Sequence, residues 1–120
     1  MAIPKFDFSV KQGNSGTIEN PAGLVMTIRD DSGQPRDLTG SEIVFFANWD
    51  RQNQMRLSSA AGSVEVVATE GRVTVPFDKS TFRNVSPRKA VHYELELRSG
   101  EEQRTVLEGR IHVVESFNDD

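Results

Sequence analysis

The sequence contains no cysteine, so disulfide bonds, thiolate nucleophiles and thiolate metal ligands are excluded. No apolar run approaches the roughly 20 residues that a membrane-spanning helix needs, and the first residues lack the pattern of a secretory signal. Basic residues do not dominate, since 14 Lys and Arg stand against 18 Asp and Glu. Binding to nucleic acid or to an anionic membrane needs a basic surface, so we expect neither partner, and we expect synthesis in a cytoplasm.

Familiar catalytic motifs are missing as well: there is no glycine-rich phosphate loop, nucleophile elbow or Ser/His/Asp arrangement. The two histidines, His92 and His112, fall on the outward faces of two pairing strands, near Glu94 and Glu108. A zinc site or a hydrolase centre is one interpretation of such a cluster. A solvated sheet face of mixed charge is the simpler one, and we favour it.

Paired carboxylates are the other candidate chemistry. Glu94 with Glu96, or Asp30 with Asp31, could act as the two acids of a glycosidase, which must face each other across a cleft. The first pair lies on a sheet face where we expect no cleft, and the second is typical of a turn. We therefore predict that the protein is not an enzyme and has no catalytic residues, no cofactor and no metal site.

What the sequence does have is alternation of apolar and polar residues, the mark of half-buried strands. It recurs along the chain, at Phe6–Val10, Ile43–Trp49, Val73–Phe77 and Val91–Leu97. The pattern predicts an all-β fold, an antiparallel immunoglobulin-like sandwich of about eight strands. We expect one domain over 1–120, with a short helical turn that begins at Asp78 and a frayed tail at 116–120.

The inward positions of these strands predict the core. Its members are Phe6, Phe8, Met26, Ile28, Ile43, Phe45, Trp49, Val66, Val73, Val75, Phe77, Tyr93, Leu95, Leu97, Leu107 and Ile111.

Two hairpins are predicted in detail. A two-residue loop at Glu70-Gly71 would place Thr69 opposite Arg72 and Val66 opposite Val75. In the last hairpin, a two-residue loop at Gly100-Glu101 would place Leu97 opposite Arg104, so that apolar and charged side chains would share one face of the sheet. A loop of three or five residues is expected instead.

One strand is apolar on both faces. Besides Ile43 and Phe45, it carries Val44 and Phe46 on the second face, and the last strand adds Val106 and Val114. Contiguous exposed apolar surface usually marks a partner site, although a central strand covered by a loop would show the same pattern. We take Val44, Phe46, Val106 and Val114 as the candidate interface.

A family resemblance runs from about Val25 to Val114. The segment from Asp31 to Gly40, with Asp30 before it and Ile43-Val44-Phe45-Phe46 after it, is similar to a D-x-x-G-x-P-x-D-L-T-G pattern that precedes an apolar strand in small tailed-bacteriophage proteins. The hairpin at Glu70-Gly71 and the closing strand Leu107–Val113, with its Leu-x-Gly-x-apolar-x-Val pattern, also look alike. The amino-terminal domain of siphophage baseplate upper proteins belongs to this group.

The resemblance implies a phage or prophage structural protein of the tail, baseplate or neck. Such a protein would lie in the virion and act through contacts with other virion proteins, with itself as a homo-oligomer, or both. The alternative is a β-sandwich module that binds carbohydrate or a cell surface.

Overall fold

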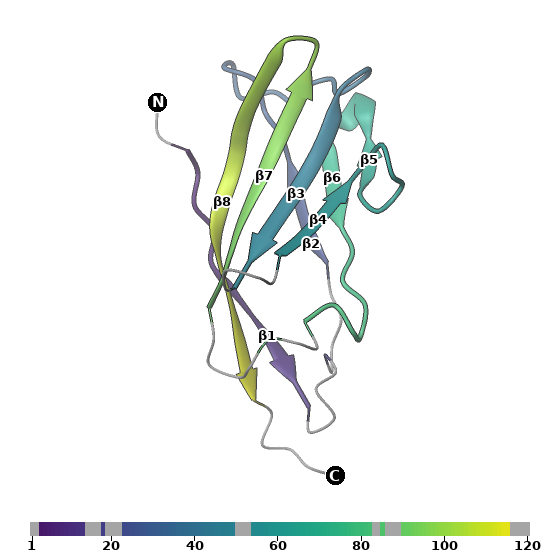
Figure 1. Ribbon diagram of the computed structural model, residues 1–120. Coiled ribbons are helices and arrows are strands. Elements are labelled where there is room, and N and C mark those ends of the chain that lie inside the picture. Colours follow the sequence, from purple (N-terminus) through teal and green to yellow (C-terminus); the bar gives the residue numbers. More distant parts are fainter. Residues whose placement is uncertain are drawn as a thin grey trace.

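The computed structural model describes residues 3–13, 18, 23–49, 54–82, 85 and 90–115, so the predicted tail at 116–120 lies outside them. Eight strands and one short 3-10 turn make up its regular structure (Figure 1). In chain order these are β1 (Phe8–Gln12), β2 (Leu24–Thr27), β3 (Glu42–Asn48), β4 (Gln54–Ser58), β5 (Glu65–Val67), the 3-10 turn η1 (Ala68–Glu70), β6 (Arg72–Val75), β7 (Ala90–Ser99) and β8 (Glu102–Glu115).

The strands form two sheets, which confirms the predicted all-β fold of about eight strands. One sheet has the order β1-β8-β7-β3-β4 and the other the order β2-β6-β5. Between the strands of the described residues all pairings are antiparallel except that of β1 with β8, which is parallel and places Phe8 opposite Ile111. The two strands come from opposite ends of the sequence, so no tight turn sets their relative direction, and a purely antiparallel sandwich was the wrong expectation for this pair.

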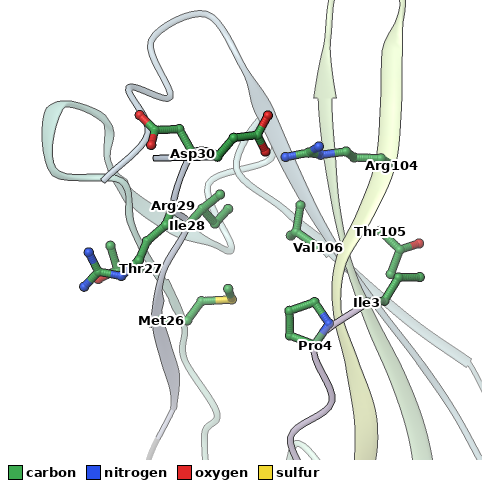
Figure 2. Close-up of a pocket in the computed structure, with 11 residues that line it drawn as sticks. Ile3, Pro4, Met26, Thr27, Ile28, Arg29, Asp30, Arg104, Thr105 and Val106 are labelled. Carbon is green, nitrogen blue, oxygen red and sulfur yellow. The ribbon is translucent and has the colours of Figure 1, made fainter. Parts of the chain in front are cut away.

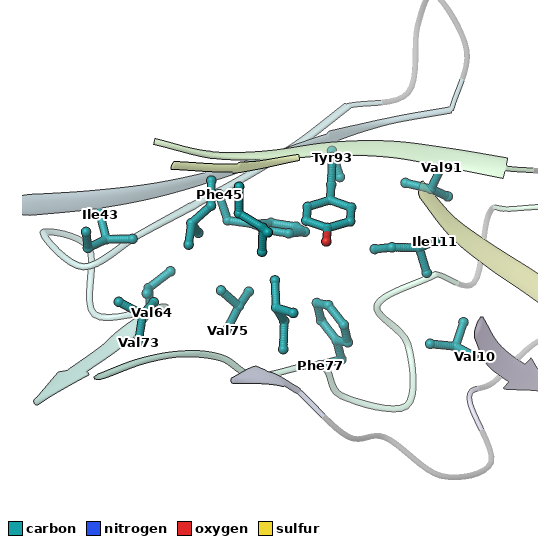
Figure 3. Close-up of a cluster of buried hydrophobic side chains, with 14 of the residues drawn as sticks. Val10, Ile43, Phe45, Val64, Val73, Val75, Phe77, Val91, Tyr93 and Ile111 are labelled. Atoms are coloured by element: carbon teal, nitrogen blue, oxygen red, sulfur yellow. The ribbon is translucent and has the colours of Figure 1, made fainter. Parts of the chain in front are cut away.

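The core lies between the two sheets (Figure 3). Phe45 and Tyr93 from the larger sheet stack with ring centres 5.7 Å apart, and Phe77 packs against Phe45 from the opposite side at 6.0 Å. The predicted core residues that are buried are Ile28, Ile43, Phe45, Val73, Val75, Phe77, Tyr93, Leu95, Leu97, Leu107 and Ile111. The others pack partly buried against this cluster, namely Phe8, Met26, Trp49 and Val66, except Phe6, which is 50% exposed and was wrongly assigned to the core.

The β5–β6 hairpin differs from its prediction in register. Val66 faces Val73 and Val67 faces Arg72, so η1 and Gly71 together replace the expected two-residue loop. The longer turn anchors the segment that follows β2. The Ile28 N–H donates to the Gly71 carbonyl (2.8 Å), and the Leu38 N–H donates to the Ala68 carbonyl (2.9 Å). A slip of two residues keeps every side chain on its predicted face, so the core is unaffected.

The β7–β8 hairpin also corrects the prediction. Ser99 pairs with Glu102 across the two-residue loop, and Leu97 does face Arg104. A β-bulge at Val106 then restores the matching of apolar faces, so that Leu95 meets Leu107 and Val91 meets Ile111. The pairing of Leu97 with Arg104 is tolerated because the Arg104 side chain remains exposed.

The predicted turn at Asp78 is present as a hydrogen-bonded turn rather than a helical one, and in the described part of the chain the helical residues are those of η1. The Asp78 carboxylate accepts the Ser80 N–H (2.9 Å) and hydroxyl (2.9 Å). The turn carries Phe82 and Val85 inward, as expected, and both are buried.

Candidate functional site

The outer face of β3 holds two of the four candidate interface residues. Val44 is fully buried yet lies outside the core cluster, between Ser58 of β4 and Glu96 of β7 in the ladder. Phe46 is half-buried. The guanidinium groups of Arg56 and Arg98 lie 5.7 Å and 5.9 Å from the centre of its ring. The second apolar face of β3 is therefore flanked by arginines and offers only part of Phe46 to solvent.

The other two candidate residues lie elsewhere. The bulge turns Val106 inward, where it packs against the core. Val114 is half-buried near the end of β8, opposite Lys11 of β1. The structure thus brings Val44 and Phe46 together but does not join them to Val106 or Val114 in one patch. An interface role for these residues stays a prediction, and it now centres on Phe46.

Phe46, Arg56 and Arg98 form a group that we name the Phe46 cluster. Arg98 Nε donates to Glu96 Oε1 at 2.6 Å, so its charge is balanced. Within the described residues, Arg56 has no ion-pair partner. Cations over an aromatic ring contribute about 0.5–1 kcal/mol each at exposed sites. Arginine and aromatic side chains are also enriched where proteins bind one another.

The histidines do not form a metal centre in the part of the chain that the structure describes. His92 faces Arg110 across the β7–β8 ladder, and His112 faces Ala90 two pairs further along. A shallow hollow of about 360 Å³ lies beside His92, Glu94 and Glu108. No group of three or more His, Asp or Glu side chains among the described residues could hold a metal ion.

Asp30, of the Asp30-Asp31 pair, and the nearby Asp37 both serve local structure. The Asp30 carboxylate accepts the Ser32 N–H (2.9 Å) and hydroxyl (2.6 Å) and the Gln34 N–H (3.1 Å), and these bonds lower its pKa, that of the Ser32 side chain most. The Asp37 pKa is lowered in the same way by the Thr39 hydroxyl (2.6 Å) and N–H (2.9 Å). Both carboxylates are therefore hydrogen-bond acceptors within turns.

Sequence reasoning missed a mainly apolar hollow of about 700 Å³, which we call the slot, between β2 and the bulged part of β8. Figure 2 shows Met26 and Ile28 on one side, facing Val106, Pro4 and Ile3 on the other. Charged groups stand around it: Arg29, Asp30 and Asp31 beside β2, and Arg104 on β8. The signal in the sequence was the two-residue loop at Gly100-Glu101, because only a bulge reconciles that loop with the apolar pattern of β8.

The N-terminal segment closes the lower end of this slot. The Glu108 N–H donates to the Pro4 carbonyl (3.1 Å), and the Phe6 N–H donates to the Glu108 carbonyl (2.9 Å). Asp7 then replaces a main-chain partner, since its carboxylate accepts the Arg110 N–H (2.9 Å).

In the part of the chain that is described, no helix is long and apolar enough to cross a bilayer.

Comparison with solved structures finds this fold in a phage protein. The N-terminal domain of phage TP901-1 ORF48 matches with a TM-score of 0.51 and 16% sequence identity, over 95% of this chain and 99% of that chain. No protein-family model matches the sequence, and no curated protein is significantly similar to it. At this identity the match establishes a shared fold. The resemblance to an amino-terminal domain of tailed-phage proteins is therefore confirmed at the level of the fold.

Proposed function

We propose that this chain is a non-enzymatic structural protein of a phage or prophage virion, acting in the tail, baseplate or neck through protein–protein contacts. The observation that carries the proposal is the fold that it shares with a phage N-terminal domain over 95% of its length. The resemblance of the Asp31–Gly40 segment and of the closing strand to tailed-phage proteins points the same way. Because a shared fold alone does not imply a shared function, the role also depends on the side chains at the surface.

The Phe46 cluster is the part of that surface best suited to a protein partner. It combines a half-exposed aromatic ring with two guanidinium groups on the outer face of the five-stranded sheet. The partner would be another virion protein, a second copy of this chain, or both. The hollow beside His92 gives no comparable support to a hydrolase, since its carboxylates and histidine are exposed or half-exposed.

The test is quantitative mass spectrometry of purified virions from the source phage or from the induced prophage. We expect this chain at a fixed ratio to the tail proteins in every preparation, and we expect the double variant His92→Gln/His112→Gln to be incorporated equally. Absence from virions would contradict the structural role. Loss of infectivity in the double variant, with normal incorporation, would instead support a catalytic role.

A further inference from the structure

The slot between β2 and β8 is bordered by two strand edges. In the described residues, β2 pairs with β6 alone, and the Glu102–Leu107 part of β8 pairs with β7 alone. An unpaired strand edge presents main-chain donors and acceptors that an added strand can satisfy. The slot therefore offers hydrogen-bonding groups along its borders as well as an apolar floor.

The N-terminal segment shows which kind of chain this edge accepts. Lys5 pairs with Glu108 in a parallel bridge, through the two main-chain hydrogen bonds at Pro4 and Phe6. Ile3, which is 38% exposed, and Pro4 line the end of the slot that is nearest Glu108. An extended segment with apolar side chains thus already lies on β8 on the C-terminal side of the bulge. The slot runs along the same edge of β8 toward Arg104.

The side chains around the slot define what its occupant must look like. Met26, Ile28 and Val106 favour apolar side chains, which in an extended segment point to one face at every second residue. Among the charged groups, Arg29 donates to the Gly33 carbonyl (3.0 Å), and Arg104 lies 3.8 Å from Glu102.

The two aspartates differ. Asp30 already accepts three hydrogen bonds from its own turn. Asp31 is exposed and, within the described residues, has neither a hydrogen bond nor an ion pair. It is the charge at the slot that a basic side chain of an occupant would complement.

We propose that the slot binds an extended segment of a partner protein, added as a strand beside Arg104–Leu107 of β8. Alternate side chains of that segment are apolar and enter the slot between Met26 and Val106. A lysine or arginine at the end nearest the Asp30-Asp31 turn lies beside the Asp31 carboxylate. The inference rests on the proposed function only for the class of partner, which is another virion protein. The side chains of the slot determine which residues the bound segment must carry.

The test is titration of the ¹⁵N-labelled full chain with the peptide acetyl-Lys-Thr-Val-Thr-Val-Thr-amide, followed by NMR, since a segment parallel to β8, like Pro4–Phe6, places its N-terminal end nearest Asp31. We expect shifts of the backbone amides of Met26–Ile28 and Arg104–Leu107 at millimolar peptide. The variant Asp31→Lys should bind this peptide about two- to fivefold more weakly, the range of an exposed ion pair, and should prefer the same peptide with Glu in place of Lys. Glu65→Lys on β5, with the same change of charge far along the smaller sheet, should bind as the wild type does.

Three results would overturn the proposal. The first is the absence of shifts at these amides, and the second is equal binding of a peptide whose valines are N-methylated and cannot pair as a strand. The third is movement of the same amides on concentrating the protein alone, which would show that a second copy fills the slot. None of these depends on the presence of the chain in virions, so failure of the slot and failure of the structural role are distinguishable.

Discussion

At the scale of single residues, Gly109 explains the glycine of the closing-strand pattern. It faces Tyr93 across the ladder, and a Cβ at this position would collide with the Phe6 carbonyl oxygen. The Tyr93 hydroxyl donates to that same carbonyl from beneath. The glycine thus allows the N-terminal segment to lie close against β8.

We expect Gly109→Ala to push the N-terminal segment off β8 and to lower the free energy of unfolding by about 1–3 kcal/mol, as for other overpacked sites. The matched variant Tyr93→Phe removes only the donated hydrogen bond and should cost about 1 kcal/mol. Urea unfolding gives both values, and hydrogen exchange at the Phe6 amide reports the release of the segment. A Gly109→Ala protein as stable as the wild type would contradict the close approach.

Tyr93 also predicts a pH dependence. Burial, and then the negative charge of Asp7, raise its pKa from the ordinary value of 10.0 to about 12. The unfolded chain therefore loses this proton first as the pH rises, so the stabilisation is complete below pH 10 and is lost between pH 10 and about 12.

Because Tyr93 is the only tyrosine, absorbance at 295 nm reports its ionisation alone. We expect a midpoint near 12 in the folded protein. Tyr93→Phe should lack this component of alkaline destabilisation. A midpoint near that of free tyrosine would show that the hydroxyl is open to solvent.

At the scale of elements, sequence alternation located the strands well and their partners less well. The apolar positions of β3, β6 and β7 are buried as predicted, because burial on one face imposes a period of two. The hairpin registers were missed because their loops serve distant segments: Gly71 accepts from Ile28, and the bulge at Val106 opens toward the slot. Contacts of this kind, between segments far apart in the sequence, leave no periodic pattern in the residues of the hairpin itself.

The bulge leads to a prediction at this scale. Deleting Val106 should give a regular ladder with the existing pairs Leu95–Leu107 and Glu96–Thr105, so the protein should fold with a stability change of about 1 kcal/mol. Deleting Arg110 instead shifts a regular part of β8 by one residue and should prevent folding, since it moves buried side chains to the wrong face. Circular dichroism during thermal unfolding distinguishes the two. A ΔVal106 chain that does not fold would show that the bulge itself is needed.

At the scale of the whole molecule, composition and alternation were enough to predict a two-sheet all-β protein, and the candidate interface was predicted less completely. A sequence shows that β3 is apolar on both faces, but it does not show that Arg56 and Arg98 come from neighbouring strands to flank Phe46. Likewise, the sequence does not show that Val106 turns inward and leaves the candidate interface, because this depends on a bulge in β8, two strands away from β3.

Self-association is the prediction that belongs to this scale. If the Phe46 cluster is an interface between copies, the wild type should associate as its concentration rises, and Phe46→Asp should weaken that association. The fold should survive, because Phe46 lies outside the core cluster and the new carboxylate would lie between two guanidinium groups. Val67→Asp, at a 44% exposed valine of β5, is the matched control and should associate as the wild type does.

Sedimentation velocity over a wide range of concentration measures the association, with circular dichroism as the test of folding. A wild type that stays monomeric throughout would restrict the Phe46 cluster to partners other than this chain. An unfolded Phe46→Asp would show that the ring stabilises β3 against β4 and β7, and the arginines would then be its structural support. Equal weakening by Val67→Asp would place the interface outside the outer face of the five-stranded sheet, because β5 lies in the other sheet.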